Sequence, residues 1–472
     1  MHATPTSNKH IIALIVSLAG FMEALDTTIL NTAIPAISRS LHVNPVDLKI
    51  ALISYLITLA ILIPISGWLA DKFGLKRVFL CAITIFTLGS LWCGFASTLS
   101  QLVVARSVQG VGGAFMLPLG RLITLRSFPR HEVVDAMNHV IMVVSIGLMV
   151  GPVAGGFITD HFSWPWIFWV NIPVGIFAFI MAATFLPHTP PKHVRPFDTL
   201  GFALFGGGLA TLTFSMSYLS ESTTNEQTAL LILCISILTL IIYFLYSHKQ
   251  PHPILNTDLF RLRTFKISIV GNLFARLGFG GVPFLLPLML QIGLGYSAVL
   301  SGMLLVPIAF GIILVKAISL RVLRKLGYRR TLVINTILVG MLLWVFQIIH
   351  LDTSPYAIAL LTFVFGLLIS LQYSAMNSLA YADMTAEELS SATSIVSTTQ
   401  QLSQSFGVAA AALLLRYYSP AATASTFILT PEVFHQTFFA MGCLTLLTSL
   451  IFFKLHLHDG HQMLKAPLEE VH

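Results

Sequence analysis

Two acidic side chains lie three positions apart inside an apolar stretch near the start of the chain. In FMEALDTTILNTAIP, residues 21–35, Glu23 and Asp26 follow the apolar run IIALIVSLAG. On a helix the two side chains stand about 60° apart, on neighbouring faces. Two carboxylates this close in a medium of low dielectric constant resist being ionised together, which suits reversible proton binding. We expect this pair to couple proton movement, or Asp26 to brace helix packing alone.

A polar stripe continues from these acids along the same helix. Thr27 and Asn31 follow Glu23 at four and eight positions, so the three side chains share one helix face. A polar stripe is costly against lipid and is expected to face the interior of a helix bundle. We therefore expect Glu23, Thr27 and Asn31 to contact a bound small molecule that competes with a proton.

An arginine inside another apolar run is a candidate partner for the acids. Arg106 begins RSVQGVGGA, with Gln109 about one turn further on. An arginine at mid-membrane costs about 2.5–3.5 kcal/mol on insertion scales, which favours a partner or an aqueous cavity, although snorkelling to the interface is the alternative. Arg106 would hold one acid charged, and Gln109 would join the cluster. Arg121, nearer the other end of this run, is interpreted as structural.

The second half of the chain offers a cation. Arg276 lies in an apolar run near Asn272 and is the best candidate there for a substrate-facing charge. His139, at the start of the fifth run, can titrate near neutral pH or merely mark the membrane edge. A cavity with acids from the first half and an arginine from the second can take cations, zwitterions or anions such as carboxylates.

Apolar runs surround all of these residues. Of the 472 residues, 56% are hydrophobic and 10% are charged, whereas a soluble protein has about 25% charged residues. The chain is therefore a polytopic membrane protein, and each spanning helix needs about 20 apolar residues. About fourteen such runs are centred on 11–33, 50–70, 78–97, 102–125, 137–158, 165–186, 200–219, 228–247, 267–291, 298–319, 331–350, 355–379, 395–416 and 436–455.

The distribution of basic residues predicts the orientation. The N-terminus and every second loop hold nineteen of the 26 Lys and Arg residues, and the opposite loops hold only Arg39, Lys49 and Arg416. Since cytoplasmic loops carry the excess of Lys and Arg, both termini are expected in the cytoplasm. The formal net charge of +7 is thus a topology signal, and no nucleic-acid partner is expected.

Two basic connections divide the runs into six, two and six. They are 187–199, which is rich in proline, and 248–266, and the hairpin between them has an acidic tip, SESTTNEQ. The expected domains are a six-helix bundle in 1–190, a linker with an inserted two-helix hairpin in 191–250, and a second six-helix bundle with a short tail in 251–472.

The segment GWLADKFGLKR, residues 67–77, is expected to form a conformational gate at the cytoplasmic end of the second and third runs. Gly67 and Gly74 allow a tight turn and close helix approach. Asp71 can accept hydrogen bonds from a neighbouring helix N-terminus and from Arg77. The matching stretch of the second half, LRVLRKLGYRR, keeps Gly327 but has no acid at the place of Asp71.

A glycine strip marks the fifth run. In GLMVGPVAGG, residues 147–156, Gly147, Gly151 and Gly155 recur every four positions and form a flat face for close packing. Pro152 adds a kink whose freed carbonyl must be satisfied locally. We expect this strip at the seam between the two halves, as part of the conformational gate.

Five stretches together carry a family resemblance: LDTTILNTAIP (25–35), GWLADKFGLKR (67–77), RSVQGVGGA (106–114), GLMVGPVAGG (147–156) and WPWIFWVNIPVG (164–175). The chain resembles the major facilitator superfamily, and within it the fourteen-helix drug:proton antiporter branch, over essentially its whole length. ARLGFGGVPF and LQIGLGYS in 275–297 are most similar to the MdtD-type group of multidrug efflux proteins. Asp26 fills the recurrent acidic place of the pattern LDxTxxNxALP, whereas Glu23 departs from it, since an amide such as Gln is expected there.

The resemblance implies an all-α membrane protein with two six-helix inverted repeats and an inserted hairpin. It also implies export of small organic compounds from the cytoplasm by alternating access, coupled to inward proton flow, with the substrate near the midplane between the halves. The glycine-rich motif of the fifth run accompanies antiport in that family. An exporter of an anionic metabolite, siderophore or metal–citrate chelate on the same fold is one alternative, and a non-transporting membrane sensor is another.

The energy source is expected to be the proton gradient. The sequence contains no GxxxxGK[ST] phosphate-binding loop, so ATP is not expected to drive transport. No metal-ligand cluster or nucleophile–base pair is apparent, so neither a cofactor nor an enzymatic activity is expected. The expected partners are a small-molecule substrate, protons and the lipid bilayer, with a monomer as the transport unit in a bacterial cytoplasmic membrane.

Overall fold

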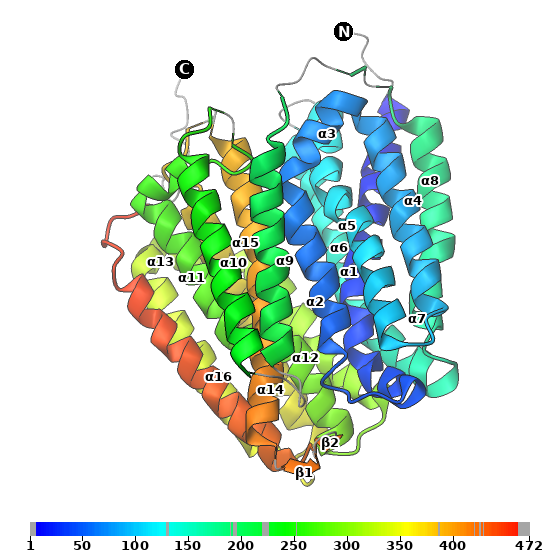
Figure 1. The fold of residues 1–472 in the computed structure, drawn as a ribbon, viewed down its shortest axis with the longest axis vertical. Helices are drawn as coiled ribbons and strands as arrows, with labels where there is room; N and C mark the ends of the chain where they lie inside the picture. The colour runs from blue at the N-terminus through cyan, green and yellow to red at the C-terminus, as the bar shows by residue number, and fades with distance from the viewer. Residues whose placement is uncertain are drawn as a thin grey trace.

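The computed structural model describes residues 6–128, 132–188, 190–191, 196–219, 226–251, 253–385, 388–419, 421–423, 426–427 and 429–460. Long helices run side by side through the height of the molecule (Figure 1). Within the described residues, twelve segments are long and apolar enough to cross a membrane. The helices α9 (Thr199–Leu219) and α15 (Leu389–Tyr418) bring the long helical segments to the fourteen that the sequence predicts.

The first helical bundle contains six of these segments. It comprises α1 (Thr6–Leu41), α2 (Lys49–Leu62), η1 (Ile63–Ile65), α3 (Ser66–Phe73), α4 (Leu75–Gly94), α5 (Leu99–Ser127), α6 (Val133–His161), α7 (Trp166–Trp169) and α8 (Asn171–Phe185). The second segment forms one span, Lys49–Phe73. Its α-helix is interrupted at Pro64, where the 3₁₀ turn η1 joins α2 to α3.

The second helical bundle contains six further segments. It comprises η2 (Thr257–Arg261), α11 (Arg263–Phe279), α12 (Val282–Leu288), η3 (Met289–Gly293), α13 (Ala298–Val345), η4 (Phe346–Ile348), α14 (Pro355–Ala380), α15, β1 (Ala421–Thr423), β2 (Thr426–Phe427) and α16 (Pro431–Phe452). The helix α13 contains two predicted spans, which meet at Gly327 with φ of 73°. Only glycine adopts this left-handed conformation readily, so Gly327 marks the turn between the two spans.

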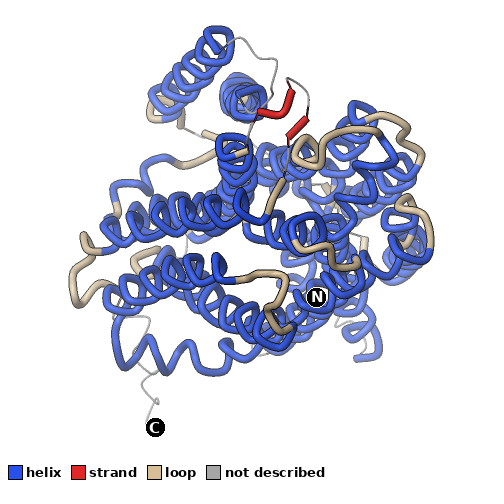
Figure 2. Tube along the Cα trace, turned by 90° about the horizontal axis from the view of Figure 1, so that it is seen from below, coloured by secondary structure: helices blue, strands red, loops and turns tan. Residues whose placement is uncertain are grey.

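The two strands are a minor addition to a helical protein. β1 and β2 pair antiparallel in a short two-stranded sheet. Figure 2, which views the molecule from below, shows these strands at one side among the helices. In Figure 1 the two strands lie at the bottom of the molecule, and we call this end the β end. The opposite end, where α3 lies, is called the α3 end.

The two bundles pack internally and then against each other. α1 packs on α6, and α4 and α2 pack on α5, whereas α13 packs on α14 and α16. Between the bundles, α6 packs on α13, α2 on α15 and α1 on α12. Of the helices that carry the polar residues expected to do chemistry, α1 packs across this interface, whereas α5 packs mainly on α4 and α2, and α11 on α16 and α15. The domain boundaries 1–190, 191–250 and 251–472 remain predictions.

The remaining hairpin covers one side of the interface. α9 packs along α10 (Glu226–Ser247) and also contacts α2 of the first bundle and α15 of the second. Figure 1 shows α9 and α10 standing in front of the line where the two bundles meet. The predicted tip of this hairpin, residues 220–225, and part of the preceding connection, residues 189 and 192–195, lie outside the described residues.

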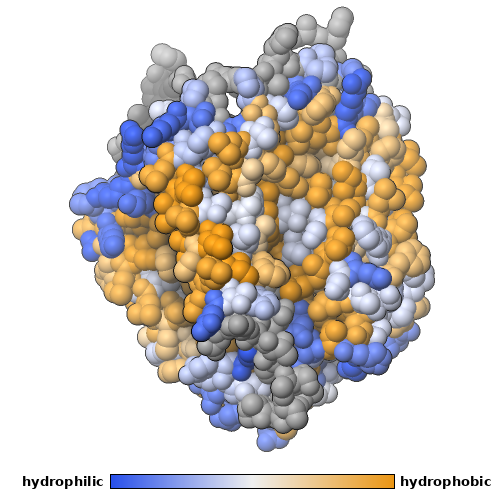
Figure 3. Space-filling view, in the orientation of Figure 1, coloured by the Kyte–Doolittle hydropathy of each residue, from blue (hydrophilic) through white to orange (hydrophobic). Residues whose placement is uncertain are grey.

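An apolar belt surrounds the molecule. Figure 3 shows hydrophobic residues over the middle of the visible face and hydrophilic residues gathered toward both ends. Large apolar side chains are exposed on α10, among them Leu231, Leu238 and Leu245. Exposed apolar surface of this extent is stable only against lipid, which agrees with the predicted class of membrane protein.

Candidate substrate and proton site

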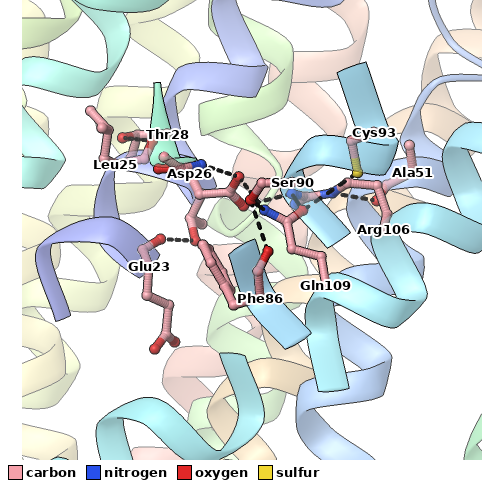
Figure 4. A network of polar contacts seen from close by, with 12 residues as sticks. Glu23, Leu25, Asp26, Thr28, Ala51, Phe86, Ser90, Cys93, Arg106 and Gln109 are labelled. Carbon is pink, nitrogen blue, oxygen red and sulfur yellow. Dashed lines mark hydrogen bonds and ion pairs between the residues drawn. The ribbon is translucent and has the colours of Figure 1, made fainter. Parts of the chain in front are cut away.

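Asp26 lies at the centre of a buried polar cluster in the first bundle (Figure 4). Its Oδ2 accepts a hydrogen bond from Nη1 of Arg106 at 2.5 Å. Its Oδ1 accepts hydrogen bonds from Nε2 of Gln109 at 2.7 Å and from Nδ2 of Asn171 at 3.1 Å. Both oxygens therefore have partners, and the carboxylate is held by three donors.

Arg106 is equally enclosed, with 1% of its surface exposed. Its Nη1 also donates to Oε1 of Gln109 at 2.6 Å, and its Nε donates to the carbonyl oxygen of Ala51 at 3.4 Å. The guanidinium lies over the ring of Tyr55, 4.3 Å from the ring centroid. A buried ion pair that is hydrogen-bonded and stacked in this way has a fixed geometry, and removing one partner leaves an uncompensated charge.

The cluster ties four helices of the first bundle together. Asp26 comes from α1, Gln109 from α5 and Asn171 from the start of α8, while α4 contributes Ser90, whose Oγ accepts from Nε2 of Gln109 at 2.7 Å. Cys93 of α4 contacts Oε1 of the same glutamine at 3.7 Å. Sequence reasoning assigned no role to Asn171 or Ser90. A signal for Asn171 was present, since its amide stands inside the apolar motif WPWIFWVNIPVG.

Glu23 has a different environment from Asp26. Figure 4 shows its side chain directed away from the Asp26 cluster. Glu23 is 6% exposed, and its Oε2 has no hydrogen-bond partner among the described residues. The basic side chain that acts on it electrostatically is Arg121 of α5. The two acids thus divide: Asp26 is part of a closed network, and Glu23 retains an unsatisfied oxygen.

A small cavity of about 30 Å³ separates the two bundles near Arg106. The first bundle contributes Thr27, Asn31 and Arg106 to its wall, and the second contributes Phe284 and Gln404. Oγ1 of Thr27 donates to the carbonyl oxygen of Glu23 at 2.7 Å. Thr27 and Asn31 of the expected polar stripe therefore face the interface between the bundles, whereas Glu23 is not among the residues that line this cavity.

Arg276 lies across this interface in the second bundle. Its Nε donates to Oδ1 of Asn272 at 2.9 Å, and its Nη1 donates to Oε1 of Gln404 at 3.3 Å. Its guanidinium lies over the ring of Tyr373, 4.0 Å from the centroid. The described ion pairs of the chain do not include Arg276. Tyr373 and Gln404, which hold Arg276 in place, were not singled out from the sequence.

A larger cavity of about 760 Å³ opens between the bundles at the α3 end. Its walls come from α3, α5 and α6 of the first bundle and from α14 and α15 of the second, and they include Gly67, Arg121, Met137, Tyr381, Ser394 and Ser397. Arg121, which the sequence suggested to be merely structural, thus lies in a cavity wall. His139 is exposed on α6 and is not part of this lining.

The β end of the interface is closed. The carbonyl group of Pro152 packs against Gly302 of α13, and Gly156 packs against the carbonyl of Ala298. Asp160 of α6 accepts a hydrogen bond from the backbone nitrogen of Val299 at 2.9 Å. The bundles are therefore apart at the α3 end and in close contact at the β end.

The expected position of the glycine strip is corrected by these contacts. Added side chains at Gly147, Gly151 and Gly155 would collide with α1, at Phe21, Thr28 and Ile29 respectively. The strip therefore lies inside the first bundle, because its flat face admits α1 closely. The seam with the second bundle is instead formed by the neighbouring positions Pro152 and Gly156.

The predicted gate segment lies beside the open cavity. Oδ1 of Asp71 accepts a hydrogen bond from Nη2 of Arg126, at the end of α5, at 3.0 Å, and Arg77 is exposed. Gly74 has φ of 90°, which a side chain would strain, so glycine is required at the turn between α3 and α4. Gly67 has open space around it. Gly327 occupies the corresponding turn of the second bundle.

Two helical bundles of six long segments each, which meet along one interface, define a polytopic membrane-protein fold. The model of the Major Facilitator Superfamily matches residues 16–408, and the chain belongs to this family. The chain is therefore a membrane transporter that acts on a small-molecule substrate.

Similar proteins agree with this family. The chain is 37% identical over 438 residues, 93% of each chain, to a protein of Enterobacter sp. (strain 638) named "Putative multidrug resistance protein MdtD". It is 36% identical over 448 residues, 95% of each chain, to the protein of the same name from Escherichia coli (strain K12).

Solved structures share the fold at low sequence identity. A peptide transporter, POT, in complex with sulfate has a TM-score of 0.71 at 14% identity, covering 96% of this chain and 95% of its own. A D-xylose–proton symporter has a TM-score of 0.67 at 14% identity, covering 96% and 99%. A bacterial homolog of the human lysosomal transporter Spinster, inward-facing and unoccupied, has a TM-score of 0.66 at 12% identity, covering 98% and 100%.

Proposed function

We propose that this transporter exports small organic compounds across the bacterial cytoplasmic membrane in exchange for protons. The observation that carries the proposal is the carboxyl group of Glu23, which is 6% exposed and has one oxygen without a partner among the described residues. A buried carboxyl group outside any closed network can gain and lose a proton without dismantling the fold. The name of the MdtD relatives supports compounds of the drug type as cargo.

Glu23 and Asp26 have separate roles in this proposal. Asp26 remains paired with Arg106 and, through Gln109 and Asn171, holds four helices of the first bundle together. Glu23 titrates, and the cargo competes with its proton. Each proton that enters down the membrane potential supplies about 2.3 kcal/mol per 100 mV, which supports export against a gradient.

Transport proceeds by alternating access. The cavity of about 760 Å³ at the α3 end gives cargo a path toward the interface. The contacts of Pro152 with Gly302 and of Gly156 with Ala298 close the β end. Release on the opposite side requires these contacts to separate while the α3 end closes, as in the rocking of two repeats around one site.

The basic loops support a cytoplasmic position for the open end. Lys72, Lys76 and Arg126 lie at the α3 end, where Lys76 and Arg126 line a smaller cavity of about 100 Å³. Since cytoplasmic loops are enriched in Lys and Arg, we assign this end to the cytoplasm. The cavity then loads from the compartment that the exporter empties.

The experiment that tests the proposal measures proton flux in proteoliposomes. The full chain is reconstituted with an imposed pH gradient and an enclosed pH-sensitive dye, and a lipophilic dye cation such as ethidium is added. Addition of ethidium should make the parent dissipate the pH gradient, whereas Glu23→Gln should leave the gradient unchanged. The matched control is Glu132→Gln, which makes the same change in a carboxylate paired with Lys9 at the molecule's edge, 39% exposed. Equal flux in parent and Glu23→Gln would contradict the assignment.

A second candidate function is export of an anionic compound, such as a carboxylate metabolite or a metal–carboxylate chelate. Arg276 favours it, because this guanidinium at the interface of the bundles is held by neutral groups, Asn272, Gln404 and Tyr373. A carboxylate of the cargo would supply the missing counter-charge. Proton flux stimulated by citrate, with no response to ethidium, would select this candidate over the first.

A further inference from the structure

A third cavity lies away from the interface of the bundles. It has a volume of about 470 Å³ and is located where the end of α10 meets the start of α11. Its lining combines aromatic and basic side chains: Phe244, His248, Thr257, Phe260, Arg261 and Lys266. None of these residues takes part in the substrate site described above.

The charges around this cavity do not balance. Nη2 of Arg261 lies 3.0 Å from Oδ1 of Asp258, and Nδ1 of His248 lies 3.5 Å from the same oxygen. Lys266 is exposed and is absent from the described ion pairs. One carboxylate therefore faces two permanent cations and a histidine, and the cavity carries a net positive charge.

The cavity lies at the edge of the apolar belt. α10 exposes Leu238, Ile241 and Leu245 on the surface that faces lipid, and Phe244, in the same last turns, forms part of the cavity wall. His248 follows directly after the end of α10. A basic pocket thus begins where the lipid-facing surface ends, at the depth of phospholipid headgroups.

We propose that this cavity binds the phosphate group of an anionic phospholipid. Arg261 and Lys266 would contact the phosphate, and Phe244 and Phe260 would contact the adjoining glycerol and the first methylene groups. The acyl chains would then continue along the exposed leucines of α10. Basic pockets between helices on the cytoplasmic side are suited to anionic headgroups, and attraction of this kind contributes about fivefold in affinity for each basic residue near the surface.

The test uses the full chain in detergent, titrated with short-chain phosphatidylglycerol and, separately, with phosphatidylcholine of the same chains. Bound lipid is counted by native mass spectrometry. The parent should bind phosphatidylglycerol more tightly than phosphatidylcholine. Lys266→Gln should weaken phosphatidylglycerol binding about fivefold, and Arg261→Gln with Lys266→Gln about 25-fold. The matched control is Arg324→Gln with Lys325→Gln, two exposed basic residues of α13 outside this cavity.

Three results would overturn the proposal. The first is equal affinity of the parent for the two lipids. The second is an equal loss in the control pair, which would indicate general surface charge. The third is displacement of phosphatidylglycerol by inorganic phosphate at equal concentration, which would indicate a site for the free anion. Lys266→Gln replaces one exposed polar side chain by another, so the variant is expected to fold.

Discussion

Each of the two bundles stacks an arginine on a tyrosine, and the two arginines differ in their counter-charge. Arg106 lies 4.3 Å from the ring centroid of Tyr55, and Arg276 lies 4.0 Å from that of Tyr373. Each also binds an amide oxygen of a residue on its own helix, that of Gln109 or Asn272. In the first bundle Asp26 neutralises the arginine, whereas the described partners of Arg276 are neutral.

This difference underlies the two roles that we propose, a structural cluster in the first bundle and a binding cluster in the second. A buried ion pair with all its hydrogen bonds made is rigid, and it has no free charge to offer a ligand. A guanidinium held by amides and an aromatic ring has its geometry fixed but its charge uncompensated. The first bundle therefore has a neutralised, rigid centre, and the second holds a charge without a described carboxylate, bonded to Gln404 of the interface cavity.

The largest effect on stability is expected from Arg106→Gln. This change leaves Asp26 buried without its cation, and breaking one side of a buried pair costs about 3–5 kcal/mol. Reversible unfolding of the purified chain in mixed detergent measures the loss. Adding Asp26→Asn should restore a large part of it, because the orphaned charge is then removed. No difference between the single and the double variant would refute the structural role of the pair.

Arg276→Gln is expected to cost less, about 1–2 kcal/mol. Two hydrogen bonds are lost, but no carboxylate is orphaned and a half-buried cation without a described carboxylate is removed. The same unfolding assay gives the comparison with Arg106→Gln. A loss as large as that of Arg106→Gln would show that Arg276 has an unrecognised structural partner, and the contrast between the bundles would fail.

Asn272→Asp converts the second cluster into a copy of the first. Oδ1 of Asn272 already accepts from Arg276 at 2.9 Å, so a carboxylate there should stabilise the chain by about 1 kcal/mol, since hydrogen bonds between charged groups are stronger than neutral ones. Proton flux stimulated by anionic cargo should fall, because the counter-charge is now internal. Combined with Arg276→Gln, the same substitution should destabilise the protein, and this double-mutant cycle isolates the pair.

The smallest effect on stability is expected from Glu23→Gln, within about 0.5 kcal/mol. The substitution keeps the size of the side chain and breaks no described ion pair or side-chain hydrogen bond of Glu23. Asp26→Asn is the matched comparison, since the same chemical change there leaves Arg106 uncompensated. If Glu23→Gln proves as destabilising as Asp26→Asn, Glu23 belongs to the structural cluster and not to the titrating site.

Much of the fold was predictable because lipid restricts the chain to long apolar helices. The predicted runs 298–319 and 331–350 both form within α13, and the non-helical backbone of Gly327, with φ of 73°, separates them. The run predicted at 267–291 is divided into α11, α12 and η3, where Gly280 and Gly281 interrupt the helix. The lengths of the apolar runs could be predicted from the sequence, but the positions where the helices are interrupted depend on local packing.

The site was predictable only in part. Charged residues in apolar runs pointed to Glu23, Asp26, Arg106 and Arg276, because an unpaired charge is too costly against lipid. Their hydrogen-bond partners could not be predicted, because Asp26 and Arg106 are 80 positions apart and Asn171 is 145 positions from Asp26. The glycine strip around Gly151 indicated close helix packing, but it did not indicate that α1 is the helix packed against it.

The sequence by itself determined the membrane class, the number of long helices, the basic end and the few charges that must avoid lipid. The membrane class and the helix number follow from the hydropathy of successive residues, and the basic end follows from the count of Lys and Arg in the loops. Only the tertiary structure decided which acid is neutralised, which arginine is left without a carboxylate and which end of the interface is open. These are contacts between helices far apart in the chain, and their energies depend on distances of a few ångströms that no spacing in the sequence encodes.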